Sequence, residues 1–186
     1  MRDESRGELQ NSMELQKPWA GFLADLDAAL TSSVEVHCLG GFVLIAAYDI
    51  PRATGDLDYL MTLPNDASPL LENLGGPDSK LGKKHNVCVQ RVGVTDLPED
   101  YDSRLTELKL GLKHLRLLAL DPYDLILSKL TRNSPKDVED VMFLARTQHL
   151  EFSVMYSIFE KEMKPWLPNL ARHKLTLKLW SEYFSH

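Results

Sequence analysis

Two short segments decide the fold of this chain: Leu39-Gly40-Gly41-Phe42 and Arg52-Ala53-Thr54-Gly55-Asp56-Leu57-Asp58. Residues 34–39 are rich in β-branched and apolar types, and they predict a strand that ends at the Gly-Gly turn. The apolar run 42–48 predicts a short helix directly after that turn. Residues 56–62 predict a second strand, on which the two aspartates project from the same face because side chains alternate along a strand.

The pairing of acidic residues with a glycine turn indicates a specific chemistry. Asp56 and Asp58 repel each other unless a cation lies between them. Mg²⁺ (or Mn²⁺) commonly takes one or two protein carboxylates together with substrate phosphates. Gly40-Gly41 would expose backbone N–H groups at a helix N-terminus, where phosphates bind. These features predict a metal-assisted phosphoryl-transfer site; the alternative is two solvated aspartates on an edge strand and a simple tight turn.

The remainder of the chain predicts strands mixed with helices, followed by helices alone. Apolar residues recur at helical spacing over 18–30, and the other predicted elements are a short helix over 66–74, strands over 86–94 and 112–120, and helices over 122–130, 135–147, 153–163 and 172–184. This order is typical of an α+β (α/β) fold with a helical C-terminal part. We expect a flexible N-terminal arm over 1–16, a core over 17–120 and the helical part over 121–186.

The composition excludes several classes of protein. The chain has 186 residues, of which 44% are hydrophobic, and a formal net charge of -6, which argues against a protein that coats nucleic acid. Cys38 and Cys88 alone cannot build a disulfide framework or a zinc site. The polar N-terminus lacks a signal peptide, and the run 42–48 is too short to cross a bilayer. We therefore expect a cytoplasmic protein that does not contact a membrane.

The ordered set of Gly40-Gly41, Arg52, Thr54 and Asp56-Leu57-Asp58 resembles the signature of polymerase-β-like minimal nucleotidyltransferases. Further along, Lys129 in the run 121–130 and Lys136-Asp137-Val138-Glu139-Asp140 are similar to the Lys and Lys-Asp-x-x-Asp motifs of AbiEii-type nucleotidyltransferases. These include toxins of toxin–antitoxin and abortive-infection systems. The resemblance covers roughly residues 18–150 and is closest to an uncharacterised bacterial branch. It implies a small mixed sheet flanked by helices.

The resemblance also implies a role for each matching residue. Asp56 and Asp58 would be catalytic and would bind Mg²⁺ or Mn²⁺. Lys129 would also be catalytic, because it would reach a triphosphate oxygen and neutralise charge in the transition state. The other nucleotide-binding positions would be Gly40 and Gly41 at the phosphates, Arg52 and Thr54 in the loop before the acidic strand, and Asp137 and Asp140 lining or supporting the pocket. The implied reaction transfers a nucleoside monophosphate from a nucleoside triphosphate to a tRNA or protein acceptor, and a cognate toxin or antitoxin would be the partner.

One departure from the family pattern concerns the third acidic residue, which usually lies on a later strand and activates the acceptor hydroxyl. Residues 86–94 contain no Asp or Glu, and Asp96 lies just beyond them. Asp96 is therefore our candidate for the third catalytic carboxylate. The departure supports a second hypothesis, in which a catalytically inactive nucleotidyltransferase fold serves as a binding module, such as an antitoxin or a partner subunit.

Three features keep structural alternatives. Lys129 lies among leucines, where a lysine can extend its charged end to solvent. Asp137 and Asp140 follow Ser134-Pro135, where acidic residues stabilise the positive end of a helix dipole. The segment 80–116 holds eight basic residues against five acidic ones; it would guide tRNA or a triphosphate toward the site, or simply form a solvated face.

Overall fold

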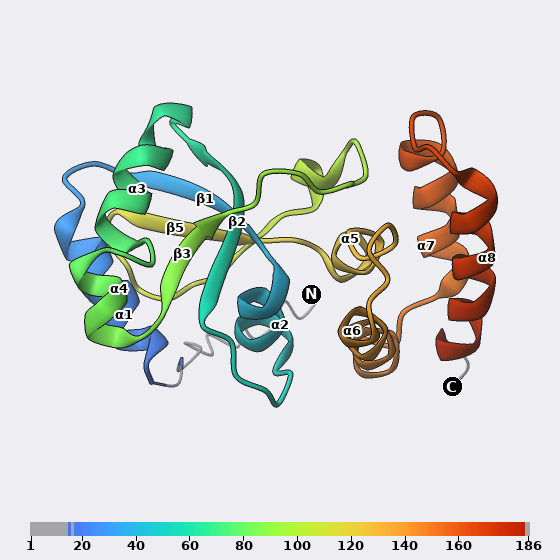
Figure 1. The fold of residues 1–186 in the computed structure, drawn as a ribbon, viewed down its shortest axis with the longest axis horizontal. Coiled ribbons are helices and arrows are strands. Elements are labelled where there is room, and N and C mark those ends of the chain that lie inside the picture. The colour runs from blue at the N-terminus through green and yellow to red at the C-terminus, as the bar shows by residue number, and fades with distance from the viewer. Residues whose placement is uncertain (1–14, 16, 185–186) are drawn as a thin grey trace, which may run out of the picture.

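The computed structural model describes residue 15 and residues 17–184, and its centre is a five-stranded mixed sheet in the order β3-β2-β1-β5-β4 (Figure 1). The strands are β1 (Val34–Leu39), β2 (Asp56–Leu63), β3 (Cys88–Arg91), β4 (Thr106–Glu107) and β5 (Leu115–Ala119). β1 runs antiparallel to β2 and parallel to β5, whereas β3 is parallel to β2 and β4 antiparallel to β5. The predicted mixed α and β fold is thereby confirmed.

The helices divide into a group around the sheet and a group beyond it. In Figure 1, α1, α3 and α4 gather at one end, α2 lies beside β2, and α5 to α8 extend away at the other end. Their bounds are α1 (Trp19–Ala29), α2 (Gly40–Tyr48), α3 (Ser68–Gly75), α4 (Lys80–His85), α5 (Pro122–Leu127), α6 (Pro135–Thr147), α7 (Phe152–Ile158) and α8 (Leu170–Trp180). Short 3₁₀ turns span Asn65–Ala67, Tyr101–Arg104 and Ser181–Phe184, and a π-helical turn spans Phe159–Met163. The predicted helical C-terminal part is confirmed.

Several predicted elements differ in extent from the observed ones. The helix predicted over 42–48 begins at Gly40, and the strand predicted over 86–94 is limited to β3. β5 begins three residues later than predicted because the Asp27 carboxylate accepts hydrogen bonds from the backbone N–H groups of Lys113, His114 and Leu115. The sequence pattern did not predict α4 or β4, which are both very short.

The pairing of β1 with β2 positions the glycine turn. Leu39, the last residue of β1, pairs with Asp58 of β2 in the antiparallel register. The chain then turns at Gly40 into α2, so the start of this helix lies beside the acidic strand. On the other side of β2, Asp56 pairs with Cys88 and Asp58 with Gln90 of β3. The register therefore places a helix N-terminus and both aspartates at one end of the sheet.

The β3–β4 loop (residues 92–105) connects the sheet to the helical part. The Tyr101 hydroxyl lies 3.3 Å from His37 Nδ1 of β1. Arg104 donates to both carboxylate oxygens of Asp124 in α5, at 2.8 and 2.9 Å, and to Glu162 at 2.7 and 2.9 Å. Because Asp124 is fully buried, these ion pairs fix the loop against α5 and the π-helical turn.

The structure describes only part of the predicted N-terminal arm. Residues 1–14 and 16, most of the predicted N-terminal arm, lie outside the described residues. The predicted boundary at residue 120 lies one residue after the end of β5, and the division into 17–120 and 121–186 stays a prediction. Within the described part of the chain, no helix is long and apolar enough to cross a membrane.

Candidate functional site

The two glycines of the turn are each close to a polar side chain of the predicted site. Gly40 has a φ of +73°, and a Cβ at this position would lie 2.5 Å from Asp58 Oδ2. A Cβ on Gly41 would lie 2.9 Å from Thr54 Oγ1. Positive φ and close approach both favour glycine, because only glycine lacks the Cβ. The Gly-Gly turn therefore brings the start of α2 against the acidic strand and the loop that precedes it.

The start of α2 offers unpaired backbone donors. Its N-cap residue, Leu39, supplies no side-chain hydrogen bond, and the first turn contains no acidic residue. The first N–H groups of a helix have no partner within the helix, and they carry the positive end of its dipole. This end is therefore suited to a phosphate or another anion.

Asp56 and Asp58 form the acidic pair that the sequence predicts. Asp56 is exposed and Asp58 half-buried, and neither makes an ion pair with another residue in the described part of the chain. Burial raises the pKa of Asp58, and the charge of Asp56 raises it further. The Cys88 thiol donates a hydrogen bond of 3.4 Å to Asp56 Oδ1. The pair thus holds negative charge that no cation contacts directly.

The donor set fits a hard divalent cation. Two carboxylates are enough for Mg²⁺, which keeps several waters and completes its coordination with substrate phosphates. Asp58 Oδ2 lies against the start of α2, so a cation there would be next to the proposed phosphate position. Among the described residues, no group of three or more His, Cys, Asp or Glu side chains is arranged to hold a metal. The acidic pair Asp56 and Asp58 would thus supply only two of the ligands of such a cation, and water and phosphate would supply the others.

A pocket of about 340 Å³ lies beside Asp58. It brings together four predicted site residues from distant parts of the sequence, namely Gly40, Asp58, Asp96 and Lys129. The other residues around it are Leu39, Val92, Val94, Thr95, Ser128, Thr131 and Arg132. The pocket thus lies between the sheet, the β3–β4 loop and the connection from α5 to α6.

Asp96 lines this pocket but is already engaged. Its Oδ2 accepts a hydrogen bond of 2.6 Å from Thr131 Oγ1. The bond joins the β3–β4 loop to the connection between α5 and α6. Asp96 therefore lines the pocket, and its hydrogen bond with Thr131 joins two of the segments around it.

Asp137 and Asp140 are buried in α6. They line neither the pocket beside Asp58 nor the second pocket, which is described below. Asp140 Oδ2 lies 2.7 Å from Lys129 Nζ, and Arg52 binds the same carboxylate with both terminal nitrogens. Asp137 binds Arg132 and lies 3.4 Å from Lys129 Nζ. The two aspartates therefore support the cations around the pocket, which is one of the roles that the resemblance implies.

Asp137 also helps to cap the N-terminus of α6. Its Oδ2 accepts hydrogen bonds from the Ser134 N–H and hydroxyl, and the Ser134 hydroxyl accepts from the Asp137 N–H, which forms a capping box. Burial opposes the charge on Asp137, but Arg132 and Ser134 outweigh it and lower the pKa of this carboxyl well below its usual range. Asp137 is therefore a fixed anion that orients Arg132.

Arg132 is the pocket residue that sequence reasoning missed. It lies three residues after Lys129, in the short connection before Ser134. The motifs that carry the resemblance include Lys129 and the segment that starts at Lys136, and they pass over this position. The sequence did contain a signal, because Arg132 is a second cation between Lys129 and the segment that starts at Lys136, and the resemblance gives both of these a place at the nucleotide site.

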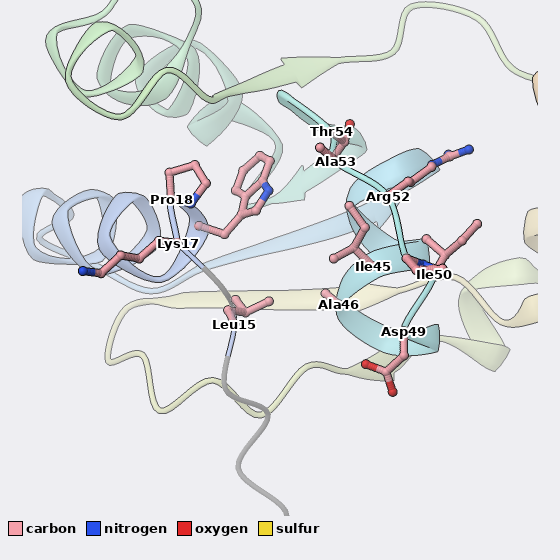
Figure 2. Close-up of a pocket in the computed structure, with 12 residues that line it drawn as sticks. Leu15, Lys17, Pro18, Ile45, Ala46, Asp49, Ile50, Arg52, Ala53 and Thr54 are labelled. Atoms are coloured by element: carbon pink, nitrogen blue, oxygen red, sulfur yellow. The ribbon is translucent and has the colours of Figure 1, made fainter.

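A second pocket, of about 620 Å³, lies between the start of α1, α2 and the loop 49–54 (Figure 2). Arg52 and Thr54 line this pocket and not the one beside Asp58. Figure 2 shows the Arg52 side chain extending away from Pro18 and Ile45. Arg52 and Thr54 therefore lie beside Gly41 and next to the second pocket. Arg52 connects the loop 49–54 to α6 through its ion pair with Asp140.

The basic segment 80–116 does not form one free positive face. Lys84 pairs with Asp25 at 2.7 Å, Lys83 with Asp78 at 3.8 Å, and Arg116 with Glu35 at 2.8 Å. Arg104 is held by Asp124 and Glu162. Half of the eight cations are thus paired with carboxylates, which reduces the field that the segment can present to a ligand.

A comparison with known protein families gives one match. The sequence profile of the family called "Nucleotidyltransferase of unknown function (DUF6036)" matches residues 23–186, a range that includes the glycine turn, both aspartates, Lys129 and Arg132. No curated protein and no solved structure matches the chain. The match covers most of the sequence, and the chain therefore belongs to this family of nucleotidyltransferases.

Proposed function

We propose that the protein is a metal-dependent enzyme that transfers a nucleoside monophosphate from a nucleoside triphosphate to an RNA or protein acceptor. One observation carries the proposal: the unpaired carboxylates of Asp56 and Asp58 lie at the uncapped N-terminus of α2, with Gly40 in contact with Asp58. A carboxylate pair would be repelled by phosphates unless a cation joined them. The family match supports nucleotidyl transfer as the reaction class.

The residues around the pocket would divide the work. Asp56 and Asp58 would hold Mg²⁺ or Mn²⁺, which when bound neutralises phosphate charge and orients the triphosphate. Backbone N–H groups at the start of α2 would bind phosphate oxygens. Asp96 would accept the proton of the acceptor hydroxyl. The acceptor oxygen would form a bond to the α-phosphorus, and the bond from that phosphorus to the bridging oxygen would break and release pyrophosphate.

We place the acceptor among tRNA and proteins, and a toxin or defence role follows from the resemblance to AbiEii-type enzymes. The test uses the full chain with each of the four α-³²P-labelled nucleoside triphosphates, Mg²⁺, and total cellular RNA and protein. Label on an RNA or a protein band would support the proposal and identify the acceptor. The matched variant is Asp56→Asn with Asp58→Asn, which keeps side-chain size and removes the metal ligands.

The proposal predicts Mg²⁺-dependent nucleotide binding in the wild type and its loss in the double variant. Binding that persists unchanged in Asp56→Asn with Asp58→Asn would contradict it. The same comparison with Mn²⁺ determines which of the two metals supports the reaction.

A second candidate function is a nucleotide-binding module that transfers nothing. The hydrogen bond from Thr131 to Asp96 favours it, because a carboxylate used to join two segments is less available as a base. The two candidate functions predict different results for the Asp96→Asn variant and the wild type. If the protein is an enzyme, this variant keeps nucleotide binding and loses most of the transfer; if it is a module, the wild type binds nucleotide and transfers no label.

A further inference from the structure

The two cations that line the pocket beside Asp58 are held in different ways. The Lys129 side chain is only 6% exposed, and its ammonium group lies between Asp137 and Asp140 at 3.4 and 2.7 Å. A buried ammonium in contact with two carboxylates is already compensated. A phosphate could gain this lysine only by competing with both aspartates.

Arg132 is anchored yet exposed. Its Nε donates to Asp137 Oδ2 at 2.7 Å and its Nη2 to Asp137 Oδ1, while the side chain remains 71% exposed. A guanidinium has five N–H bonds, and this pairing uses two of them. No other described residue accepts a hydrogen bond from Arg132. Three N–H bonds therefore remain for a ligand, on a group whose orientation Asp137 already fixes.

The ion pairs around the pocket also indicate that Arg132 is the cation open to a ligand. Arg52, Lys129 and Arg132 carry three positive charges, and Asp137 and Asp140 carry two negative ones. Arg132 is the most exposed of the three cations, because its side chain is 71% exposed, whereas the side chains of Arg52 and Lys129 are 21% and 6% exposed and both bind the buried Asp140. An anion that approaches the pocket therefore meets Arg132 as the accessible cation.

We propose, on the basis of the proposed function, that Arg132 is the side chain that contacts the polyphosphate of the nucleotide. Lys129 has a structural role in this assignment, because it compensates the buried charges of Asp137 and Asp140. This assignment reverses what the family resemblance implies for Lys129. A planar guanidinium with free N–H bonds also suits phosphate oxygens better than a buried point charge does.

The lining of the pocket is consistent with this placement. Arg132 and Asp58 both line it, from the connection between α5 and α6 and from β2. A phosphate between the two would be in contact with the metal side and the arginine side of the pocket.

The experiment measures binding of inorganic tripolyphosphate with Mg²⁺ to the full chain by titration calorimetry. This probe has neither base nor sugar, so it reports the polyphosphate contact alone. The variants are Arg132→Ala, Arg132→Lys, Lys129→Gln and the control Lys136→Ala, which removes a nearby positive charge that does not line the pocket. Thermal unfolding of each variant shows whether it is folded at the temperature of the titration.

We expect Arg132→Ala to weaken binding about 10- to 100-fold, the loss typical of one charge-assisted contact, and Arg132→Lys to recover part of it. Lys136→Ala should bind within about twofold of the wild type, since a screened charge at a distance contributes little. Lys129→Gln should unfold at a lower temperature, because it leaves two buried carboxylates less compensated. Where it is folded, it should bind tripolyphosphate within about threefold of the wild type.

Two results would overturn the inference while leaving the proposed function in place. One is wild-type affinity in Arg132→Ala. The other is a loss in folded Lys129→Gln as large as that in Arg132→Ala. If Lys129→Gln does not fold, Lys129→Arg replaces it, and the comparison of Arg132→Ala with Lys136→Ala still decides whether Arg132 makes the contact. A wild type that binds neither nucleoside triphosphates nor tripolyphosphate would contradict the proposed function itself, and the inference with it.

Discussion

Gly40 and Asp58 lie side by side, although they belong to different elements, and both the backbone and the available space favour glycine at position 40. A Cβ there would lie 2.5 Å from Asp58 Oδ2, and the backbone has a φ of +73°. The antiparallel register that pairs Leu39 with Asp58 brings the two together. The contact places a carboxylate at the N-terminus of α2, which is the relationship that a metal-bound phosphate requires.

The first prediction concerns Gly40→Ala. Alanine in the left-handed conformation costs about 1–2 kcal/mol. Its Cβ would also displace the Asp58 carboxylate, so Mg²⁺-dependent nucleotide binding should fall at least about 10-fold, which corresponds to about 1.4 kcal/mol. Gly55→Ala is the matched control, because nothing lies within 4 Å of a Cβ at that position. Equal nucleotide affinity in the two variants, measured by calorimetry, would contradict the proposed role of the contact.

The second prediction separates stability from activity at Asp58. Burial and the charge of Asp56 raise the pKa of this carboxyl, so its ionised form is disfavoured in the folded protein. Asp58→Asn should therefore unfold at the same temperature as the wild type or slightly above it, while Mg²⁺-dependent nucleotide binding is lost. Thermal unfolding and calorimetry on the same sample test both parts. A clear decrease in the unfolding temperature would show that Asp58 has a structural role instead.

The elements that the sequence predicted best are those with a local pattern. β1 and α6 have the predicted bounds, because a β-branched run ends at glycines in one and Ser134-Pro135 precedes an amphipathic run in the other. The fold class and the family-level function followed from such segments, and the profile match to nucleotidyltransferases confirms that level. The AbiEii-type branch, the metal and the acceptor stay predictions.

The arrangement around the site could not be predicted in the same way, because it depends on pairs far apart in the sequence. Arg52 reaches Asp140 across 88 positions, and no spacing rule connects them. Asp137, which forms the capping box of α6 with Ser134, also holds Arg132 beside the pocket through two hydrogen bonds. Local patterns specify helices and strands, whereas ion pairs between elements depend on how those elements pack.

The third prediction concerns the ion pairs that fasten the β3–β4 loop. Asp124 is fully buried, and Arg104 is the cation that binds it. Arg104→Met would leave this carboxylate without its partner, and we expect a loss of about 3–5 kcal/mol in the free energy of unfolding. Arg116→Met removes a half-exposed arginine that also bridges two carboxylates, and it should cost clearly less because solvent screens these pairs. Urea denaturation measures both, and equal losses would contradict the structural role of Arg104.

The last prediction is a pH-dependent loss of stability that originates at Asp27. The Asp27 carboxylate accepts hydrogen bonds from the N–H groups of Lys113, His114 and Leu115, at 2.7 to 3.0 Å. Burial opposes the charge, but these three donors prevail and lower the pKa of Asp27 below its ordinary value. Because the folded pKa is the lower one, the stabilisation is fully present above the unfolded pKa of about 3.9 and is lost as the pH falls through the folded pKa.

Asp27→Ala should therefore cost about 2–4 kcal/mol at pH 7, since it leaves backbone donors at the start of β5 without their partner. The difference from the wild type should become smaller as the pH is lowered from about 5 toward 2, because the wild-type carboxyl is then protonated as well. Asp25→Ala, two residues away on α1, removes pairs with Lys84 and His85 at the surface, and it should cost clearly less than Asp27→Ala because solvent screens such pairs. Urea denaturation of the three proteins across this pH range is the measurement. A cost for Asp27→Ala that stays constant with pH would show that the ionised carboxylate does not hold the start of β5, because only the charged form accepts all three bonds.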